Sequence, residues 1–317
     1  MIESGPSRKT LAPPSSATLP LCLAVSAILI FSLLGPAGHA GASGASDPLL
    51  TKSSDKKKAT LRWEPPQVDA PIASLAMTPP CSLPDVLNQA GMRATSLVSH
   101  LQNFTAHERI RYEEMDDLGN PDFASTEDFD YFVDFGEKAG ALASHETRTQ
   151  INKDSTDVRE ARDTGLAVLA LIFHPLMRDD YDMRCEGYGA WNEQPAWVVR
   201  FQQKKDKKPR TLSLHTPTSS HNVSLKGRAW IAADSGEIMH LETNLVAGIA
   251  ILGLQGNAVS VDYGPVQFHS QQVELWLPKT AQAYADYGKR RTIIDHTFSE
   301  FQLFSVQTQQ QIEKPKE

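Results

Sequence analysis

The stretch from Leu225 to Val306 constrains the fold more than any other part of the chain. Two apolar runs, Leu225–Ile231 and Ile238–Leu245, flank the turn tripeptide Asp234-Ser235-Gly236. Apolar runs joined by short turns of this kind predict antiparallel hairpins. Further strand-like runs follow at residues 259–266, 271–277, 281–287 and 292–306. The stretch therefore predicts a meander of long antiparallel strands. It carries almost no residues of catalytic type, which favours a scaffold that encloses or binds something over an enzyme.

A helix is predicted well before this meander, starting at Ser82. Residues Ser82 to Asp85 have the form of a capping box, and Pro84 fits within a first helical turn. Apolar residues then recur with the period of one helix face, at Leu83, Val86, Leu87, Ala90, Ala94, Leu97, Val98 and Leu101. This spacing gives one apolar stripe that faces a core.

The period changes to two after Phe104, which indicates strands. One face carries Ala106, Glu108, Ile110 and Tyr112, and the other His107, Arg109 and Arg111. Turn residues at 117–122 separate this run from a second strand at 129–135, and residues 142–149 form a short third one.

A second helix is expected between these strands and the meander. Thr156 or Asp157 would cap it, the apolar run Leu166–Phe173 would be its buried part, and Pro175 would end it. Strands are predicted at 181–186 and 196–201, with a glycine-rich turn at residues 187–189 between them. The basic cluster at residues 204–210 is typical of a solvated hairpin tip.

Together these elements predict an α+β fold. About nine or ten antiparallel strands would form one strongly curved sheet, an unclosed β-barrel, and two or more helices would cover its apolar face. We expect a single domain over residues 81–306 and a polar tail at residues 307–317.

The N-terminus has the pattern of a secretory signal at residues 1–40. Arg8 and Lys9 precede the apolar run Leu19–Leu34, and small residues up to Ala40 follow it. The run is shorter than the roughly 20 residues of a membrane-spanning helix. We therefore expect export to the periplasm or secretion, with an inner-membrane anchor through Leu19–Leu34 as the alternative. Residues 41–80, rich in Pro, Ser and Lys, are predicted to be a flexible linker.

Removing the signal leaves two cysteines, Cys81 and Cys185. Exported proteins fold in oxidising compartments, where a disulfide persists. We predict that the two cysteines pair and link the start of the folded region to its middle. Two separate buried thiols are the alternative.

Composition and motifs exclude several functions. The net charge is −7 and there is no concentrated basic face, so a nucleic-acid partner is not expected. We find no G-x-S-x-G, H-E-x-x-H, Walker or G-x-G-x-x-G pattern. His107-Glu108 and His145-Glu146 begin like a zinc-protease motif but lack its second histidine. The sequence accordingly predicts no catalytic residue, no metal site and no cofactor.

Large aromatic residues on the predicted strands are the remaining candidates for a site. Those that could line an apolar cavity are Trp197, Phe201, Trp230, Trp276, Phe298 and Phe301. Core packing uses the same residue types. The sequence leaves both interpretations open for each of them.

The meander resembles the LolA-type superfamily, which includes periplasmic lipoprotein carriers, outer-membrane lipoprotein-sorting proteins and RseB-type regulators. The resemblance is carried by L-K-G-R-A-W-I-A-x-D-S-G-E-I at residues 225–238, D-Y-G-P-V at residues 262–266 and L-W-L-P-K at residues 275–279. The N-terminal half, with Cys81-Ser82-Leu83-Pro84, is similar to exported bacterial proteins of the same layout. The resemblance implies an unclosed β-barrel around an apolar cavity, with helices plugging it.

These features give an ordered set of functional expectations. The first is a non-enzymatic envelope protein that binds a lipid, a lipoprotein acyl chain or another apolar ligand, with no stable membrane span once the signal is cleaved. The second is an interaction or sensor module that recognises an envelope protein through the sheet's edge or face. The third and least supported is a hydrolase whose site is assembled from unlinked residues.

Overall fold

The structure is a computed structural model of the 317-residue chain. It describes residues 62–304, except 78, 102, 139–140, 152–162, 167–168, 217–218 and 270. Two compact units divide the chain at residue 56, and all described residues belong to the second. The predicted signal, the first part of the predicted linker and the polar tail lie outside the described residues. Among the helices that are described, none has both the length and the apolar character to cross a membrane.

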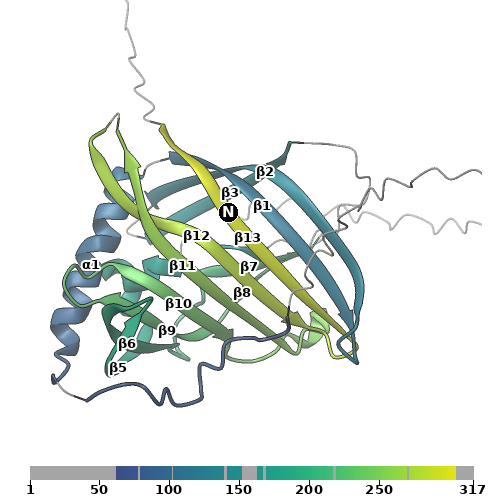
Figure 1. Ribbon diagram of the computed structural model, residues 1–317, viewed down its shortest axis with the longest axis horizontal. Helices are drawn as coiled ribbons and strands as arrows, with labels where there is room; N and C mark the ends of the chain where they lie inside the picture. Colours follow the sequence, from purple (N-terminus) through teal and green to yellow (C-terminus); the bar gives the residue numbers. More distant parts are fainter. Residues whose placement is uncertain are drawn as a thin grey trace, which may run out of the picture. The chain divides into compact units, whose positions relative to one another are not determined.

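The second unit is built on one antiparallel sheet of ten strands, in the order β3-β2-β1-β13-β12-β11-β10-β9-β6-β5 (Figure 1). Its strands are β1 (Asn103–Asp116), β2 (Pro121–Lys138), β3 (Ala141–Gln150), β5 (Tyr181–Trp191), β6 (Gln194–Gln203), β9 (Leu225–Ala232), β10 (Ile238–Leu245), β11 (Gly256–Phe268), β12 (Val273–Asp286) and β13 (Arg290–Phe304). A smaller sheet contains β4 (Asp163–Thr164), β7 (Leu212–Thr216) and β8 (Ser219–Val223).

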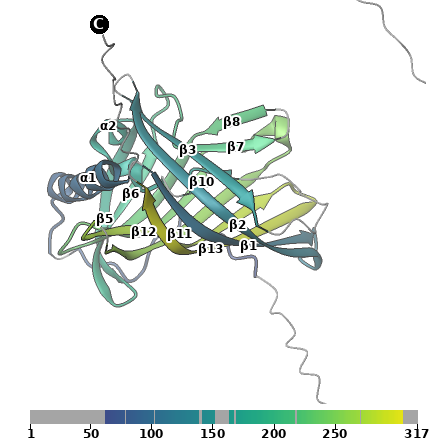
Figure 2. The same cartoon turned by 90° about the horizontal axis from the view of Figure 1, so that it is seen from above.

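The large sheet is curved and open. Its edge strands β3 and β5 do not pair with each other, and β1, β2 and β3 curve across the strands of the meander (Figure 2). The predicted curved, unclosed antiparallel sheet is thus confirmed. The helical part of the α+β prediction is met in number but small in extent, because the described residues hold two α-helices and one of them is a single turn.

The two faces of the large sheet differ in what covers them. Side chains alternate between faces along a strand, so Ala229 and Ile231 of β9 join the main hydrophobic cluster while Trp230 joins a second one. We call the face that carries the main cluster the inner face, and the opposite one the outer face. The small sheet and the helical segments add their apolar side chains to the inner face.

The helix α1 (Leu83–His100) confirms the predicted first helix and buries the predicted stripe, including Val86, Ala90 and Leu97. It packs on the 3₁₀ helix η1 (Leu169–Phe173). Gly91 allows this close approach, because a Cβ there would lie 3.3 Å from the carbonyl oxygen of Phe173.

The prediction of a second long helix was wrong where it can be checked. Its proposed caps, Thr156 and Asp157, lie outside the described residues. The part predicted to be buried forms the 3₁₀ helix η1. Pro175, which was predicted to end a helix, instead begins the short helix α2 (Pro175–Arg178). Proline suits a first helical position because its missing N–H would have no partner there.

The predicted glycine turn at residues 187–189 was also wrong, because β5 continues through it to Trp191. The strand bulges beside Cys185, where Gly187 adopts a φ of +150°. A Cβ on Gly187 would lie 2.9 Å from the carbonyl oxygen of Ala76. The turn lies instead at Asn192 and Glu193, both with positive φ.

Two further strand predictions need correction. The two strands predicted at 271–277 and 281–287 are a single strand, β12, because a bulge at Lys279 accommodates Pro278 without breaking the ladder. The basic segment 204–210 is largely exposed, but it joins β6 to the small sheet and does not close a hairpin. Strands β7 and β8 were not predicted.

Residues 62–77, which we call the lead-in segment, lie along the outer face and have no regular structure beyond one bridge from Ala76 to Tyr188. Arg228 donates hydrogen bonds to the carbonyl oxygens of Gln67 and Ala70. Arg200 and Lys226 bind the carboxylate of Asp69, which lowers its pKa through the hydrogen bond from Lys226 and then that from Arg200. These ties hold the segment on β5, β6 and β9, although a flexible linker was predicted over residues 41–80.

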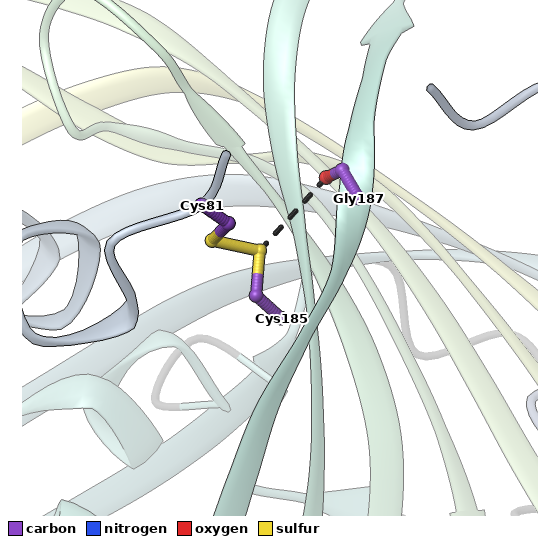
Figure 3. Close-up of a disulfide and its surroundings, with 3 residues drawn as sticks. All are labelled: Cys81, Cys185 and Gly187. Atoms are coloured by element: carbon purple, nitrogen blue, oxygen red, sulfur yellow. Dashed lines mark hydrogen bonds between the residues drawn. A yellow bond between two sulfur atoms is a disulfide. The ribbon is translucent and has the colours of Figure 1, made fainter. Parts of the chain in front are cut away.

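Cys81 and Cys185 form the predicted disulfide (Figure 3). It joins the residue before the N-cap of α1 to β5, across a sequence separation of 104. The sulfur of Cys185 lies 4.0 Å from the carbonyl oxygen of Gly187, beside the bulge of β5. The disulfide therefore attaches both α1 and the lead-in segment to an edge strand.

Replacing both cysteines with serine (C81S/C185S) should lower the free energy of unfolding by about 2–5 kcal/mol, because the unfolded chain loses a long-range constraint. Urea unfolding followed by circular dichroism would measure the change. Wild-type protein treated with a reducing agent provides the control and should unfold like the double variant. Equal midpoints for oxidised, reduced and substituted protein would contradict the prediction.

Candidate functional site

The six aromatic residues predicted to line a cavity are divided between environments. Phe201 and Phe298 are fully buried in the main cluster, and Trp197 and Phe301 pack against it while partly exposed. Trp276 packs against both clusters. Trp230 belongs to the second cluster, with Ala196, Val198, Ala232 and Met239 on the outer face. The structure thus places Phe201 and Phe298 in one cluster. Trp230 lies in the other cluster, on the opposite face.

Two hollows border these residues. One, of about 40 Å³, lies between α1 and strands β10 to β12, and its lining includes Arg93, Leu97, Tyr263 and Trp276. It has room for one or a few water molecules. The other is an open depression of about 330 Å³ on β5 and β6, lined by Asp182, Met183, Arg184, Arg200, Phe201 and Gln202.

A cluster of buried polar side chains lies on the inner face. Its members come from five strands and are Glu108, Tyr131, Glu146, Arg148, Tyr263 and His296, which we call the inner polar cluster. Glu108 is at its centre. The Nε of Arg148 lies 2.5 Å from one carboxylate oxygen of Glu108, and Nδ1 of His296 lies 2.8 Å from the other.

Further contacts extend the cluster around Arg148. Its guanidinium lies over the ring of Tyr131, 4.7 Å from the centroid, and 3.9 Å from the carboxylate of Glu146. The side chains of Glu108, Glu146 and Arg148 are at most 3% exposed. Three ionisable groups are thus enclosed inside an otherwise apolar face.

Several polar atoms of this cluster lack a hydrogen-bond partner of ordinary geometry among the described residues. They are the hydroxyls of Tyr131 and Tyr263, both carboxyl oxygens of Glu146, and Nε2 of His296. Leaving a buried polar group unpaired costs about 1–3 kcal/mol. Part of this cost is offset, because the Tyr131 hydroxyl interacts with the carboxyl of Glu146, which also interacts with the backbone N–H of Gly165, and Tyr263 interacts with the backbone of Ala170.

The two glutamates of the cluster have opposite charge preferences. Burial raises the pKa of Glu108, but Arg148 and His296 outweigh it and hold that pKa at about 2. Burial also raises the pKa of Glu146, and there it outweighs the attraction of Arg148 and the backbone N–H of Gly165. Glu108 is therefore the ionised partner of Arg148, and Glu146 favours its neutral form. Burial likewise raises the pKa of both Tyr131 and Tyr263.

A second polar group lies on the outer face around His240. The ring of Trp191 stacks on the imidazole at a centroid distance of 3.6 Å, and the ring of Trp230 lies edge-on at 5.0 Å. Nδ1 of His240 lies 2.8 Å from Asp262, which also accepts a hydrogen bond from the indole N–H of Trp191. Nε2 of His240 lies 3.5 Å from Glu242.

This outer group is suited to holding a charge. Burial lowers the pKa of His240, but the hydrogen bonds to Asp262 and Glu242 outweigh it and raise that pKa overall. Carboxylates flank both ring nitrogens, and only 3% of the side chain is exposed. The arrangement ties the β5–β6 hairpin to β10 and β11. No group of three or more metal-binding side chains occurs among the residues that the structure describes.

Neither polar group was predicted, although one signal was present. Glu108 shares a strand face with Ala106 and Ile110, so period-two alternation already placed a charged residue on an apolar face. Its partners could not be inferred, because Arg148 and His296 are 40 and 188 residues away. His107 and His145 point to the opposite face from Glu108 and Glu146, consistent with a chance resemblance to the zinc-protease motif.

Comparison with known proteins gives distant structural likenesses only. No protein-family model and no curated protein matches the chain. A DUF1329 family protein from Desulfovibrio piger ATCC 29098 is similar over 70% of this chain and 92% of its own, with 10% identity and a TM-score of 0.39. A domain named as an outer membrane lipoprotein-sorting protein, from Vibrio parahaemolyticus, is similar over 72% and 94%, with 11% identity and a TM-score of 0.37.

A LolA superfamily protein from Nitrosomonas europaea is similar over 71% of this chain and 95% of its own, with 11% identity and a TM-score of 0.33. Two of the three names belong to the group that the sequence motifs resemble. At these TM-scores the likeness carries no conclusion about what this chain binds.

Opposite effects are expected from E108Q and E146Q. E108Q leaves Arg148 buried without its ionised partner and should lower the free energy of unfolding by about 3–5 kcal/mol at neutral pH. The pKa of Glu108 is lowered on folding, so its stabilisation is present above the unfolded pKa of about 4.3 and is lost as pH falls towards 2. The cost of E108Q should shrink over that range.

The pKa of Glu146 is raised on folding, so its contribution is present below the unfolded pKa and is lost as pH rises through the folded value. E146Q should therefore stabilise the protein at neutral pH and lose this advantage in acid. Urea unfolding at several pH values would measure both changes. E64Q, at the exposed pair of Arg62 and Glu64, is the control and should change stability by less than about 1 kcal/mol. Equal signs for E108Q and E146Q would refute the assignment.

The His240 group should make stability depend on pH in the opposite direction from Glu108. Its raised pKa stabilises the folded state below the unfolded value of about 6.5, and this contribution is lost as pH rises through the folded pKa. H240Q should flatten the decline in the urea midpoint above about pH 6.5. H145Q, at an exposed histidine of β3, should leave the decline intact. An unchanged profile in H240Q would rule out this role.

Proposed function

We propose that this protein is a non-enzymatic, exported envelope protein that binds an apolar ligand, a lipid or a lipoprotein acyl chain, against the inner face of its open sheet. One observation carries the proposal. The inner face presents a group of neighbouring aromatic side chains at its β1–β2–β13 side, and that group extends from a fully buried residue to a partly exposed one. An apolar binding surface needs both depth and an opening.

This aromatic group consists of Phe104, Phe135, Phe298 and Phe301, and we call it the aromatic wall. The ring of Phe104 lies 6.3 Å from Phe135 and 6.2 Å from Phe301 between centroids. Phe298 is linked to the wall through Tyr131, whose ring lies 5.3 Å from Phe298 and 6.2 Å from Phe104. Phe104 is fully buried, whereas Phe301 is partly exposed.

A bulge in β13 places Phe301, the partly exposed residue of the aromatic wall, on the inner face. Phe298 is on the inner face, so strict alternation would place residues 300 and 302 there as well. Glu300 instead adopts a φ of +53°, and the register against β1 shifts at this point. The shift turns Phe301 and Leu303 towards the main cluster. A left-handed conformation is unfavourable for glutamate, so the strand accepts strain to present an aromatic ring here.

Export is supported by independent features of the chain. The N-terminal 40 residues have the pattern of a secretory signal. The disulfide between Cys81 and Cys185 suits an oxidising compartment. Both features agree with a role in the periplasm or outside the cell.

A second candidate function is favoured by the edge of the large sheet. Strand β3 is an edge strand of ten residues, and it pairs only with β2 among the described residues. The other edge strand, β5, is bridged to the lead-in segment at Ala76 and Tyr188. A peptide of an envelope protein could add to β3 as a further strand.

The apolar-ligand proposal is tested by binding of dansyl-undecanoic acid, a fluorescent fatty acid, to the purified full chain. We expect one probe molecule to bind per chain, and native mass spectrometry of protein taken from the envelope to show an adduct of lipid mass. F301A removes an accessible ring of the aromatic wall and should weaken binding by about 5–30-fold, which corresponds to about 1–2 kcal/mol.

W63A is the matched control, because Trp63 is a partly exposed aromatic residue that packs on Tyr284, away from the main cluster. It should leave the affinity unchanged. Absence of probe binding together with lipid-free spectra would overturn the proposal. Equal losses in F301A and W63A would remove the aromatic wall as the binding surface.

A further inference from the structure

Strands β12 and β13 part beside the aromatic wall (Figure 1). Their ladder starts at the pair Thr280–Thr297 and runs from there towards the turn that joins them. Residues 273–279 of β12 continue along β11 and residues 298–304 of β13 continue along β1, and neither set is paired with the other. We call the place between these two sets the split. Backbone pairing therefore does not close the sheet here.

Lys279 borders the split on the inner face. Leu277 and Ala281, two residues before and after it, belong to the main cluster, and alternation gives Lys279 the same direction. Gly264 leaves room for the stem of this lysine, since a Cβ there would lie 3.2 Å from its Cγ and 3.4 Å from its Cε. The ammonium group lies over the ring of Phe301, 5.2 Å from the centroid. Lys279 thus reaches from β12 to the partly exposed end of the aromatic wall on β13.

The charge of Lys279 has no counter-ion among the residues that the structure describes. Burial alone lowers the pKa of Lys279, and no neighbouring carboxylate opposes that change. Glu108 and Arg148, which are more deeply buried on the same face, bind each other instead. A partly desolvated cation on an apolar face costs free energy, and an anion that binds beside it lowers this cost.

The position of Lys279 suits the head group of an amphiphile. Phe104 of the aromatic wall is fully buried, whereas Phe301 is partly exposed. A tail that lies along the wall therefore has its inner end at Phe104 and its outer end at Phe301, next to the ammonium group. A carboxylate or a phosphate at that outer end would pair with Lys279. An uncharged head would leave the lysine unpaired, and a cationic head would be repelled by it.

We infer that Lys279, at the edge of the split, binds the anionic head group of an amphiphile whose apolar tail lies along the aromatic wall. The inference rests on the proposed function and adds a head-group class and an anchoring residue to it. A fatty acid and a lysophosphatidate share this chemistry, the first through a carboxylate and the second through a phosphate.

Four probes with the same oleoyl chain and different heads test the inference: oleate, oleoyl lysophosphatidate, oleoylglycerol and oleylamine. Their affinities for the full-length protein are measured at neutral pH, below the micelle concentration of each probe. The readout is displacement of N-phenyl-naphthylamine, an uncharged fluorophore that does not itself need a cation. The wild type should bind the two anionic probes about 5–20-fold more tightly than the uncharged and cationic ones, as a charge-assisted contact predicts.

K279Q removes the charge and keeps most of the length of the side chain. It should weaken the binding of the anionic probes about 5–20-fold and leave oleoylglycerol within about twofold of its wild-type affinity. K279R keeps the charge and should keep the preference for anions. If only oleate depends on Lys279, the head is a carboxylate, and if only the lysophosphatidate does, it is a phosphate.

K289Q is the matched control, because Lys289 is exposed in the turn that joins β12 and β13, at the other end of their ladder. It makes the same change of charge and should leave all four affinities unchanged. Urea unfolding of ligand-free K279Q checks that this variant folds. Its midpoint should match or exceed that of the wild type, because folding of the wild type partly buries an unpaired charge.

The outcomes separate the two proposals. If none of the four probes binds, the proposed function fails, and the inference fails with it. If all four bind equally well, or if oleoylglycerol or oleylamine binds most tightly, apolar-ligand binding stands and the head-group inference is overturned. Equal losses of all four probes in K279Q, or a loss of the anionic probes in K289Q as large as in K279Q, would also overturn it.

Discussion

An open sheet of ten strands has to cover one apolar face without a second sheet of its own size, and the rest of the structure depends on this constraint. The inner face is covered by pieces taken from many parts of the chain: α1, η1 and the small three-stranded sheet. Each piece contributes a few large apolar side chains, among them Leu97, Phe173 and Leu212. No single one of these elements covers the whole inner face. The face is therefore buried by contacts between segments that are far apart in the sequence.

The same constraint explains why charged groups are buried together. The inward positions of β1 and β3 include charged side chains that are at most 3% exposed, and buried charges need partners. Glu108, Arg148 and His296 satisfy one another across three strands that are separate in the sequence. Such a pair contributes less net stability than its short distances suggest, because desolvation opposes the attraction. Its stronger effect is to make strand register costly to change, since a one-residue slip would move Glu108 to the other face.

On the outer face, polar ties act beside a small hydrophobic cluster, against which Ile72 and Leu75 of the lead-in segment pack. Arg228 and Arg200 hold the lead-in segment through its backbone carbonyls and Asp69. The disulfide fixes Cys81, which follows that segment, to β5. Bulges at Gly187, Lys279 and Glu300 adjust the strands where regular alternation would misplace a side chain. The proposed binding surface owes its accessible end, Phe301, to the last of these.

Local patterns in the sequence determined the helix α1, most strands of the meander, the pairing of the two cysteines and the position of Glu108 on an apolar face. The helix, the strands and the position of Glu108 depend on residues close together in the sequence. The cysteine pairing could be predicted because only two cysteines remain after the predicted signal. Tertiary structure alone decided the bulges, the continuation of β5 through its glycines, the short helices in place of a long one, and the separation of Trp230 from Phe201. It also brought together the two polar groups. Their members are up to 188 residues apart in the sequence. They are held together by burial and by pairing between distant strands, and neither can be inferred from a local sequence pattern.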